Sequence, residues 1–368
     1  MKRTRARSEG TERGTFRAAA CPHALPTQGR NTNTLTPSNL LRAGTSRAPA
    51  VSRRAKQTIL AATILATGFC LAQSRPGSRL NRSQDLSGNF VRLEGGLVVN
   101  EDELHTAREI ESHASGTPDW TNAPGFEQDV FTFTRVIFKS DAGPRSSRGR
   151  FRWLGWWVDY PDADLNLSYR LQQLTSIKTD PDARVLKLTD AMLTHYPLLY
   201  MEHAGYMRLN DDELSALRKY LLNGGALFVN DFWGAEEWNG FAAEIKRVLP
   251  GYVWTDLTID HPVFHSIYDL RGPIQKLQVP TIQFWNRDYD PHDPQSALQT
   301  LFRGEGSEEM HVRAMFDDHR RMMILAIHNS DVSDGWEREG QNEAYFHQFS
   351  ERIAYPLGIN IIFYLMTH

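Results

Sequence analysis

Short apolar runs alternate with helical patterns over the last two thirds of the chain. The runs are rich in β-branched and aromatic residues, and polar or glycine residues end them, as is typical of buried strands. Five such runs are predicted strands: Phe131–Phe138, Val185–Leu188, Pro197–Met201, Ala226–Asn230 and Tyr252–Leu257. Because strands that alternate with helices form parallel sheets, we expect an α/β fold, a three-layer sandwich around a largely parallel, doubly wound sheet.

The segments between these runs carry helix signals. Leu214, Leu217 and Leu221 repeat at helical spacing, after a capping-box pattern formed by Asn210 and Glu213. A glycine that adopts the left-handed conformation is expected to end this helix. The remaining expected elements are a helix that opens at Pro161 and runs through Leu174, a helix over Glu236–Val248, a hairpin of Arg313–Phe316 with Met322–Ile327, and a final helix from about Glu343 that is bent at Pro356.

The first 130 residues have a different pattern. Met1–Ala50 is rich in Arg, Ser, Thr, Pro and Gly without apolar periodicity, so we expect disorder, or a mis-assigned extension if translation starts at Val51. Residues 51–72 join a basic stretch, an apolar run and a small-x-small end, which predicts a secretory signal peptide cleaved after Ala72. Residues 73–130 are expected to be a leader and peripheral segment, and residues 131–368 the α/β domain.

Export with cleavage is favoured over an uncleaved anchor. The apolar run Ile59–Ala72 has 14 residues, whereas a spanning helix needs about 20, so no membrane span is expected in the mature chain. Arg53 and Arg54 leave both the Sec and the Tat route open. The predicted location is therefore periplasmic or secreted.

Charge and cysteine content exclude several classes of function. Residues 1–72 hold 12 of the 41 Lys and Arg residues and 2 of the 44 Asp and Glu residues, which leaves a formal charge of −13 on the rest. Such an acidic body is not expected to bind nucleic acid. Cys21 and Cys70 both precede the predicted cleavage site, so the mature chain has no disulfide, no thiolate nucleophile and no Cys metal ligand. No cofactor is predicted, and protein partners are unknown.

Several segments from Phe131 onward carry a family resemblance. They are Trp157–Asn166, Tyr169–Thr175, Gly224–Gly234, Asp260–His265, Asn329–Arg338 and the ending Tyr355–His368. Through them the chain resembles the bacterial family called domain of unknown function 4159. That family is similar in outline to the class I glutamine amidotransferase-like fold, including trehalose-utilisation-type proteins, so the resemblance implies a flavodoxin- or amidotransferase-like sheet.

The resemblance implies no reaction. In amidotransferases a Cys lies at the sharp turn after the strand that corresponds to Ala226–Val229, and a His follows a later strand. This chain has Asn230 and Asp231 at that turn, where Asp-Asp is the commoner family pair. Cysteine-dependent catalysis is therefore not expected.

Asp231 and His328 are the candidate catalytic residues if the protein is an enzyme. Asp231 follows a predicted strand and could be a nucleophile, a general base or a metal ligand, although a helix N-cap is the favoured alternative. His328 follows the run Met322–Ile327, where the resembling fold has its catalytic His. We expect the two side chains to face one cleft, where His would act as acid or base. A buried His bound to a loop carbonyl is an equal alternative.

Further polar residues are expected at the same strand edge, because ligands of open α/β sheets bind at the carboxyl ends of strands. Asp159, Asp162 and Asp164 could bind Ca²⁺ or Mg²⁺, but an acidic helix start is favoured and no metal site is assigned. His261 and His265 flank a proline, which favours a turn over a zinc site. The predicted ligand-binding residues are Asp159, Tyr160, Asp162, Glu202, Asn230, Trp233 and Asn329.

Three functions remain open from the sequence. The first is an exported protein that binds a small polar ligand, for which Trp rings beside Asp carboxylates suggest a carbohydrate. The second is a hydrolase that uses Asp231 and His328, with or without a metal. The third is an interaction module of an envelope assembly.

Overall fold

The computed structural model describes residues 89–93, 96–125, 129–141, 155–283, 285–288, 290 and 304–368. All of them belong to one unit, Leu80–His368. The predicted N-terminal extension and signal peptide, Met1–Ala72, lie outside the described residues, and so do residues 73–88 at the start of the predicted leader and peripheral segment.

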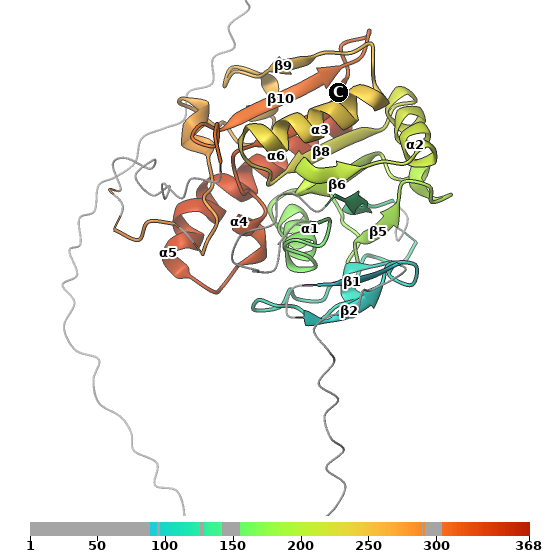
Figure 1. Ribbon diagram of the computed structural model, residues 1–368. Helices are drawn as coiled ribbons and strands as arrows, with labels where there is room; N and C mark the ends of the chain where they lie inside the picture. Colours follow the sequence, from blue (N-terminus) through green and yellow to red (C-terminus); the bar gives the residue numbers. More distant parts are fainter. Residues whose placement is uncertain are drawn as a thin grey trace, which may run out of the picture. The chain divides into compact units, whose positions relative to one another are not determined.

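A seven-stranded sheet runs through this unit in the order β5-β3-β6-β8-β11-β10-β9 (Figure 1). The first five strands in that order are parallel, and β10 pairs antiparallel with both β11 and β9. The predicted α/β class with a largely parallel sheet is confirmed. The strands are β3 (Thr134–Ile137), β5 (Arg184–Lys187), β6 (Leu198–Glu202), β8 (Ala226–Asn230), β9 (Trp254–Asp256), β10 (His311–Phe316) and β11 (Met322–His328).

The sheet order creates a switch point between β3 and β6. The chain leaves β3 for β5 on one side and then returns to β6 on the other side, as in flavodoxin-like sheets. Right-handed crossovers that run in opposite directions place their helices on opposite faces. Accordingly α1 (Asp162–Leu174) packs against α6 (Tyr355–Thr367), whereas α2 (Asp211–Leu222) packs against α3 (Gly234–Val248).

The central strands are apolar along their whole length because helices cover both faces of the sheet. Every residue of β6, β8 and β11 is buried. The face covered by α6 is completed by its isoleucines, Ile359, Ile361 and Ile362, which have no exposed surface. This core fixes the positions of the residues that follow each strand.

Local sequence signals explain where α2 begins and ends. Asn210 accepts a 3.0 Å hydrogen bond from the backbone of Glu213, and the Glu213 carboxylate accepts one from the backbone of Asn210, so the predicted capping box is confirmed. Gly224 has a φ of 110°, a conformation that a side chain disfavours. The turn into β8 therefore needs glycine.

The C-terminal helical region departs in detail from the prediction. A short α5 (Glu343–Tyr345) leads into a π-helical segment, Phe346–Ala354, and the α-helical pattern resumes in α6 at Tyr355. Pro356 lies in the first turn of α6, and it has no N–H with which to continue the hydrogen bonds of the π-helical segment before it. The expected irregularity at this proline thus takes the form of a change from π- to α-helix.

Several smaller elements lie outside the seven-stranded sheet. A hairpin of β1 (Phe90–Arg92) and β2 (Val98–Asn100) precedes it, and β4 (Lys139–Ser140) pairs with β7 (Met207–Arg208). A short helix, α4 (Asp334–Glu337), follows β11 and contacts α1. None of the helices that the structure describes has the length and apolar character needed to cross a bilayer.

Candidate functional site

Four neighbouring parallel strands each deliver a carboxylate to the same edge of the sheet. Asp159 lies in the connection after β3, Glu202 ends β6, Asp231 follows β8, and Asp331 comes three residues after β11. One oxygen from each lies within 4.8 Å of the others, and all four residues are buried. We call these four residues the carboxylate cluster. It lies at the switch point, where open α/β sheets bind ligands.

The backbone at this edge has an unusual conformation. Asp159, His203, Asp231 and Asn329 have φ values of 57°, 56°, 51° and 62°. Asp, Asn and His are the non-glycine residues that tolerate this left-handed region best. The chain therefore turns sharply after each of these strands without needing glycine, and the turn itself carries a polar side chain.

Arg135 of β3 is the principal cation beneath the cluster. Its guanidinium has no exposed surface, and it lies 2.8 Å from Glu202 and forms hydrogen bonds of 3.0 Å to Asp164. It also donates to the carbonyl oxygens of Trp156 and Val158 at 2.8 and 2.9 Å. Burial alone would lower the pKa of Arg135, but the charges of Asp164 and Glu202 outweigh it and raise the pKa. The residue thus stays charged.

Asp231 is held by two neighbours on its own side of the cluster. The indole N–H of Trp233 donates a 2.7 Å hydrogen bond to Oδ1, and Nε2 of His203 lies 3.8 Å from Oδ2. The predicted role of Asp231 as a helix N-cap is wrong. The N-cap of α3 is Trp233, and the side chains that bind the helix start are Asn329, which accepts from the N–H of Gly234 at 2.8 Å, and Glu237.

A second carboxylate group adjoins the cluster. Asp334 and Glu337 of α4 each place an oxygen within 4.8 Å of one on Asp159, and both are buried. Arg338 pairs with both of them, at 3.8 Å from Asp334 and more closely with Glu337. Asp159 is therefore shared between two sets of carboxylates.

The positive charges near this edge of the sheet do not balance the negative charges that its buried carboxylates would carry when ionised. Burial, followed by the charge of Asp331, raises the pKa of Asp159 to about 6. Burial and then the charge of Asp159 raise the pKa of Glu202, and burial and then the charge of Asp331 raise that of Asp334. Oδ2 of Asp159 is buried and accepts no hydrogen bond. Bound protons or a bound cation would relieve this excess of negative charge.

His328 shares the edge but lies among aromatic and basic groups. Its Nε2 donates to the carbonyl of Gly234 at 3.0 Å, which leaves Nδ1 to accept from Arg313 at 3.2 Å. The ring packs against Phe232 and Trp238, with ring centroids 5.1 and 5.5 Å away. Burial, with the charge of Arg313 among the further causes, lowers the pKa of His328 to about 4. His328 is thus a buried histidine bound to a backbone carbonyl, but that carbonyl belongs to the first residue of α3 and not to a loop. A catalytic role of His328 stays a prediction.

Two predicted ligand-binding residues make internal hydrogen bonds. Asn230 donates to Ser333 at 2.8 Å, and Asn329 donates to the carbonyls of Gly306 and Glu309 at 2.8 and 2.6 Å. Both asparagines have no exposed surface. They connect the turn after β8 with the turn after β11 and so support the cluster from within.

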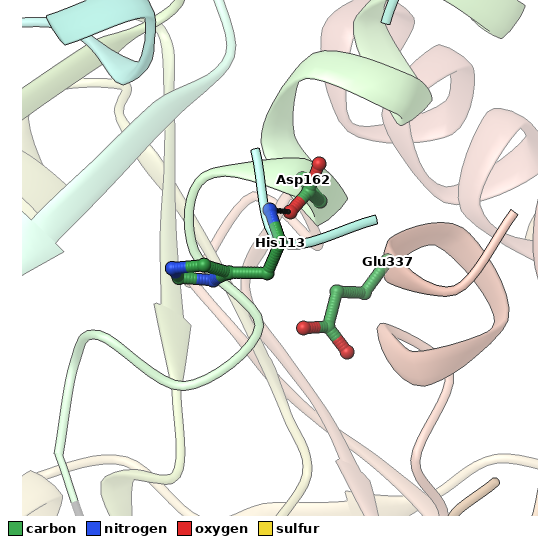
Figure 2. Close-up of side chains that lie close together, drawn as sticks. All are labelled: His113, Asp162 and Glu337. Atoms are coloured by element: carbon green, nitrogen blue, oxygen red, sulfur yellow. Dashed lines mark hydrogen bonds between the residues drawn. The ribbon is translucent and has the colours of Figure 1, made fainter. Parts of the chain in front are cut away.

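The polar residues around Pro161 contact three different parts of the chain. Tyr160 donates to the carbonyl of Thr106 at 2.7 Å, and Asp164 pairs with Arg135. Asp162 accepts from the hydroxyl of Ser112 and, at 2.7 Å, from the backbone N–H of His113. Figure 2 shows this last hydrogen bond, with the His113 ring directed away from Asp162. Of the three acids Asp159, Asp162 and Asp164, Asp159 alone belongs to the carboxylate cluster.

His113, Asp162 and Glu337 form a third close group (Figure 2). Because both oxygens of Asp162 already accept hydrogen bonds from the 112–113 loop, this group is less suited to a cation than the cluster. His261 and His265 bind no common partner: His261 accepts from the N–H of Val263, and His265 pairs with Asp269. The expected turn is confirmed there and takes the form of a short 3₁₀ helix, Pro262–Phe264.

Sequence reasoning did not assign Arg135, Asp331, Asp334, Glu337 or Arg338 to the site. One signal was present, because Asp331, Asp334 and Glu337 recur every three residues directly after a predicted strand. That spacing places Asp334 and Glu337 on one side of a short helix, which follows the loop that carries Asp331. Arg135 had no such signal, since an arginine within an apolar strand reveals its partners only after the sheet forms.

The family comparison covers the part of the chain that carries this site. The family model described as domain of unknown function (DUF4159) matches residues 151–366, which is more than half of the chain. The chain belongs to this family. The match spans Asp159 through Glu337, so both carboxylate groups lie within the family domain. No curated protein matches the sequence.

Proposed function

We propose that the carboxylate cluster binds a divalent cation and, through it, a small polar ligand. The observation that supports this most directly is the convergence of four buried carboxylates, one of which, Asp159, has an oxygen without a hydrogen-bond partner. Oxygen ligands of this kind suit Mg²⁺, Ca²⁺ or Mn²⁺ rather than soft metals. The cation would replace the protons that the raised pKa values of Asp159 and Glu202 otherwise favour.

The polar ligand would approach the cation beside Trp233. This side chain is 9% exposed, and its indole N–H is bound to Asp231. An aromatic ring next to carboxylates can stack on the apolar face of a sugar while the acids accept hydrogen bonds from hydroxyl groups. A carbohydrate is therefore the ligand class that we propose first. Its binding would involve no cysteine-dependent catalysis.

Metal-assisted hydrolysis is the second candidate. Hydrolysis by an Asp231–His328 pair would need a lone pair on His328, whereas Nδ1 accepts from Arg313 and Nε2 donates to Gly234. A cation held by the cluster would instead activate water without a histidine base. The third candidate, an interaction module, has less support, because the exposed large apolar side chains of the described residues are spread over separate elements such as those of Phe90, Leu174 and Val253.

We also propose that the protein acts outside the cytoplasm. The support is the basic, apolar and small-residue pattern of residues 51–72 together with the absence of cysteine after Ala72. A site for Ca²⁺ or Mg²⁺ is compatible with that compartment because it needs no reduced thiol.

Thermal unfolding of the chelator-treated full chain in Mg²⁺, Ca²⁺ and Mn²⁺ tests the cation site. At a cation concentration 100 times Kd, the stabilisation should reach about 2.7 kcal/mol, a rise in Tm of several degrees. Asp331→Asn should remove most of this rise. Glu244→Gln is the matched control, because Glu244 is a buried carboxylate of α3 that pairs with Arg247 outside the cluster. A Tm that none of the three cations changes would overturn the proposal.

A further inference from the structure

Asp159 belongs to two carboxylate sets at once. With Glu202, Asp231 and Asp331 it forms the carboxylate cluster, and with Asp334 and Glu337 it forms the adjoining group. In each set the potential ligand atoms lie within 4.8 Å of one another. The second set lies on α4, directly after the loop that carries Asp331, so the two sets are neighbours in sequence and in space.

Charge balance distinguishes one cation from two. The two sets contain six carboxylates, and the arginines that pair with them are Arg135 and Arg338. Arg135 also pairs with Asp164, which adds a seventh acid. Full ionisation therefore leaves about five negative charges in a buried region, where uncompensated charge is costly. One divalent cation leaves about three of them, and two cations leave about one.

We infer that this edge of the sheet holds two divalent cations bridged by the carboxylate of Asp159. The inference rests on the proposed cation site and deepens it. Glu202, Asp231 and Asp331 would hold the first cation, and Asp334 and Glu337 the second. Oδ2 of Asp159, which is buried without a hydrogen-bond partner, is the oxygen available for bridging.

A paired centre of this kind uses hard cations such as Mg²⁺ or Mn²⁺. In two-metal sites the ions lie about 3.5–4 Å apart, a spacing that one bridging carboxylate spans. The two ions would offer adjacent coordination positions to a ligand with oxygen donors. This narrows the polar ligand to molecules that present two such donors close together, as vicinal hydroxyl groups or a phosphate do.

Titration of the full chain with Mn²⁺ tests how many cations each chain binds. After chelator treatment, calorimetry should give two Mn²⁺ per chain, and electron paramagnetic resonance should show the exchange-coupled signal of a Mn²⁺ pair. Asp334→Asn should lower the count to one and abolish the coupling while the first ion stays bound. Glu244→Gln, whose carboxylate lies outside both sets, should keep two coupled ions.

The outcomes separate this inference from the cation proposal on which it rests. One uncoupled Mn²⁺ per chain, unchanged in Asp334→Asn, would overturn the pair and leave the single-cation proposal standing. No bound Mn²⁺ would overturn both. Loss of the second ion in Asp162→Asn but not in Asp334→Asn would move it to the third group and also refute bridging by Asp159. If Asp334→Asn fails to fold by circular dichroism, Glu337→Gln replaces it with the same expected counts.

Discussion

The side-chain oxygen of Asn329 accepts a 2.8 Å hydrogen bond from the backbone N–H of Gly234. A residue after β11 therefore binds the first turn of α3, which begins after β8. The amide of Asn329 also donates to the carbonyls of Gly306 and Glu309, so one buried side chain ties three segments together. This link fixes the separation of the turns that carry Asp231 and Asp331.

Replacement of Asn329 should destabilise the fold. Asn329→Ala removes the buried acceptor of the Gly234 N–H and the donor of two part-buried hydrogen bonds to the carbonyls of Gly306 and Glu309, at roughly 1 kcal/mol each. We expect a loss of about 3 kcal/mol in the free energy of unfolding, measured by urea denaturation. A loss under about 1 kcal/mol would show that water replaces these contacts and that Asn329 does not fix the turns.

Asp231→Asn should separate cation binding from stability. An asparagine oxygen can still accept the hydrogen bond from Trp233, so the turn after β8 is expected to persist. One negative charge leaves a buried set of like charges, and the cation-free variant should be as stable as the wild type or more so. Its affinity for Mg²⁺ should fall at least tenfold by calorimetry. Unchanged affinity would remove Asp231 from the ligand set.

The stability of the protein should depend on pH through His328. The folded pKa of about 4 lies below the ordinary value of 6.5, so the unfolded chain binds a proton first as the pH falls. This contribution to stability is complete above pH 6.5 and is lost as the pH falls from 6.5 to 4, by about 3 kcal/mol. The neighbouring titratable or charged groups are Arg313 and His311, and Asp256 lies within 4 Å of both, at 2.9 Å from Arg313 and 3.8 Å from His311.

His328→Gln isolates this effect, because glutamine can still donate to the carbonyl of Gly234. Urea denaturation of both proteins at pH 4.5 and pH 7 should show a smaller loss for the variant. Equal losses would mean that other groups carry the acid dependence.

Export can be checked on the protein isolated from its native host. N-terminal sequencing of the mature chain should begin at Gln73, because the predicted signal peptide ends at Ala72. Fractionation should recover this species from the periplasm or the medium. A full-length chain confined to the cytoplasm would refute the localisation and leave the cation site unaffected.

The strands of the sheet could be predicted because each apolar run is short, β-branched and ended by polar residues. The convergence of Asp159, Glu202 and Asp231 also followed from the rule that parallel strands share their carboxyl edge. The roles of individual side chains did not follow. Asp231 has the residue type of a helix cap, yet Asn329, from about one hundred residues further along the chain, binds the helix start instead. Which side chain caps a helix depends here on residues that are distant in sequence, and no local sequence pattern contains them.

The spread of the carboxylate cluster along the chain has a consequence for the order of folding. Its members come from four strands, and Asp331 joins only when β11 has paired with β8 across a sequence separation of about one hundred residues. Contacts between residues this distant in sequence are expected to form late in folding. The repulsion between the carboxylates of the cluster should therefore be weak in the folding transition state. Mg²⁺ should then slow unfolding while leaving the refolding rate nearly unchanged, as stopped-flow measurements can show. The bound ion would thus raise the kinetic stability of the folded sheet without being needed for the sheet to form.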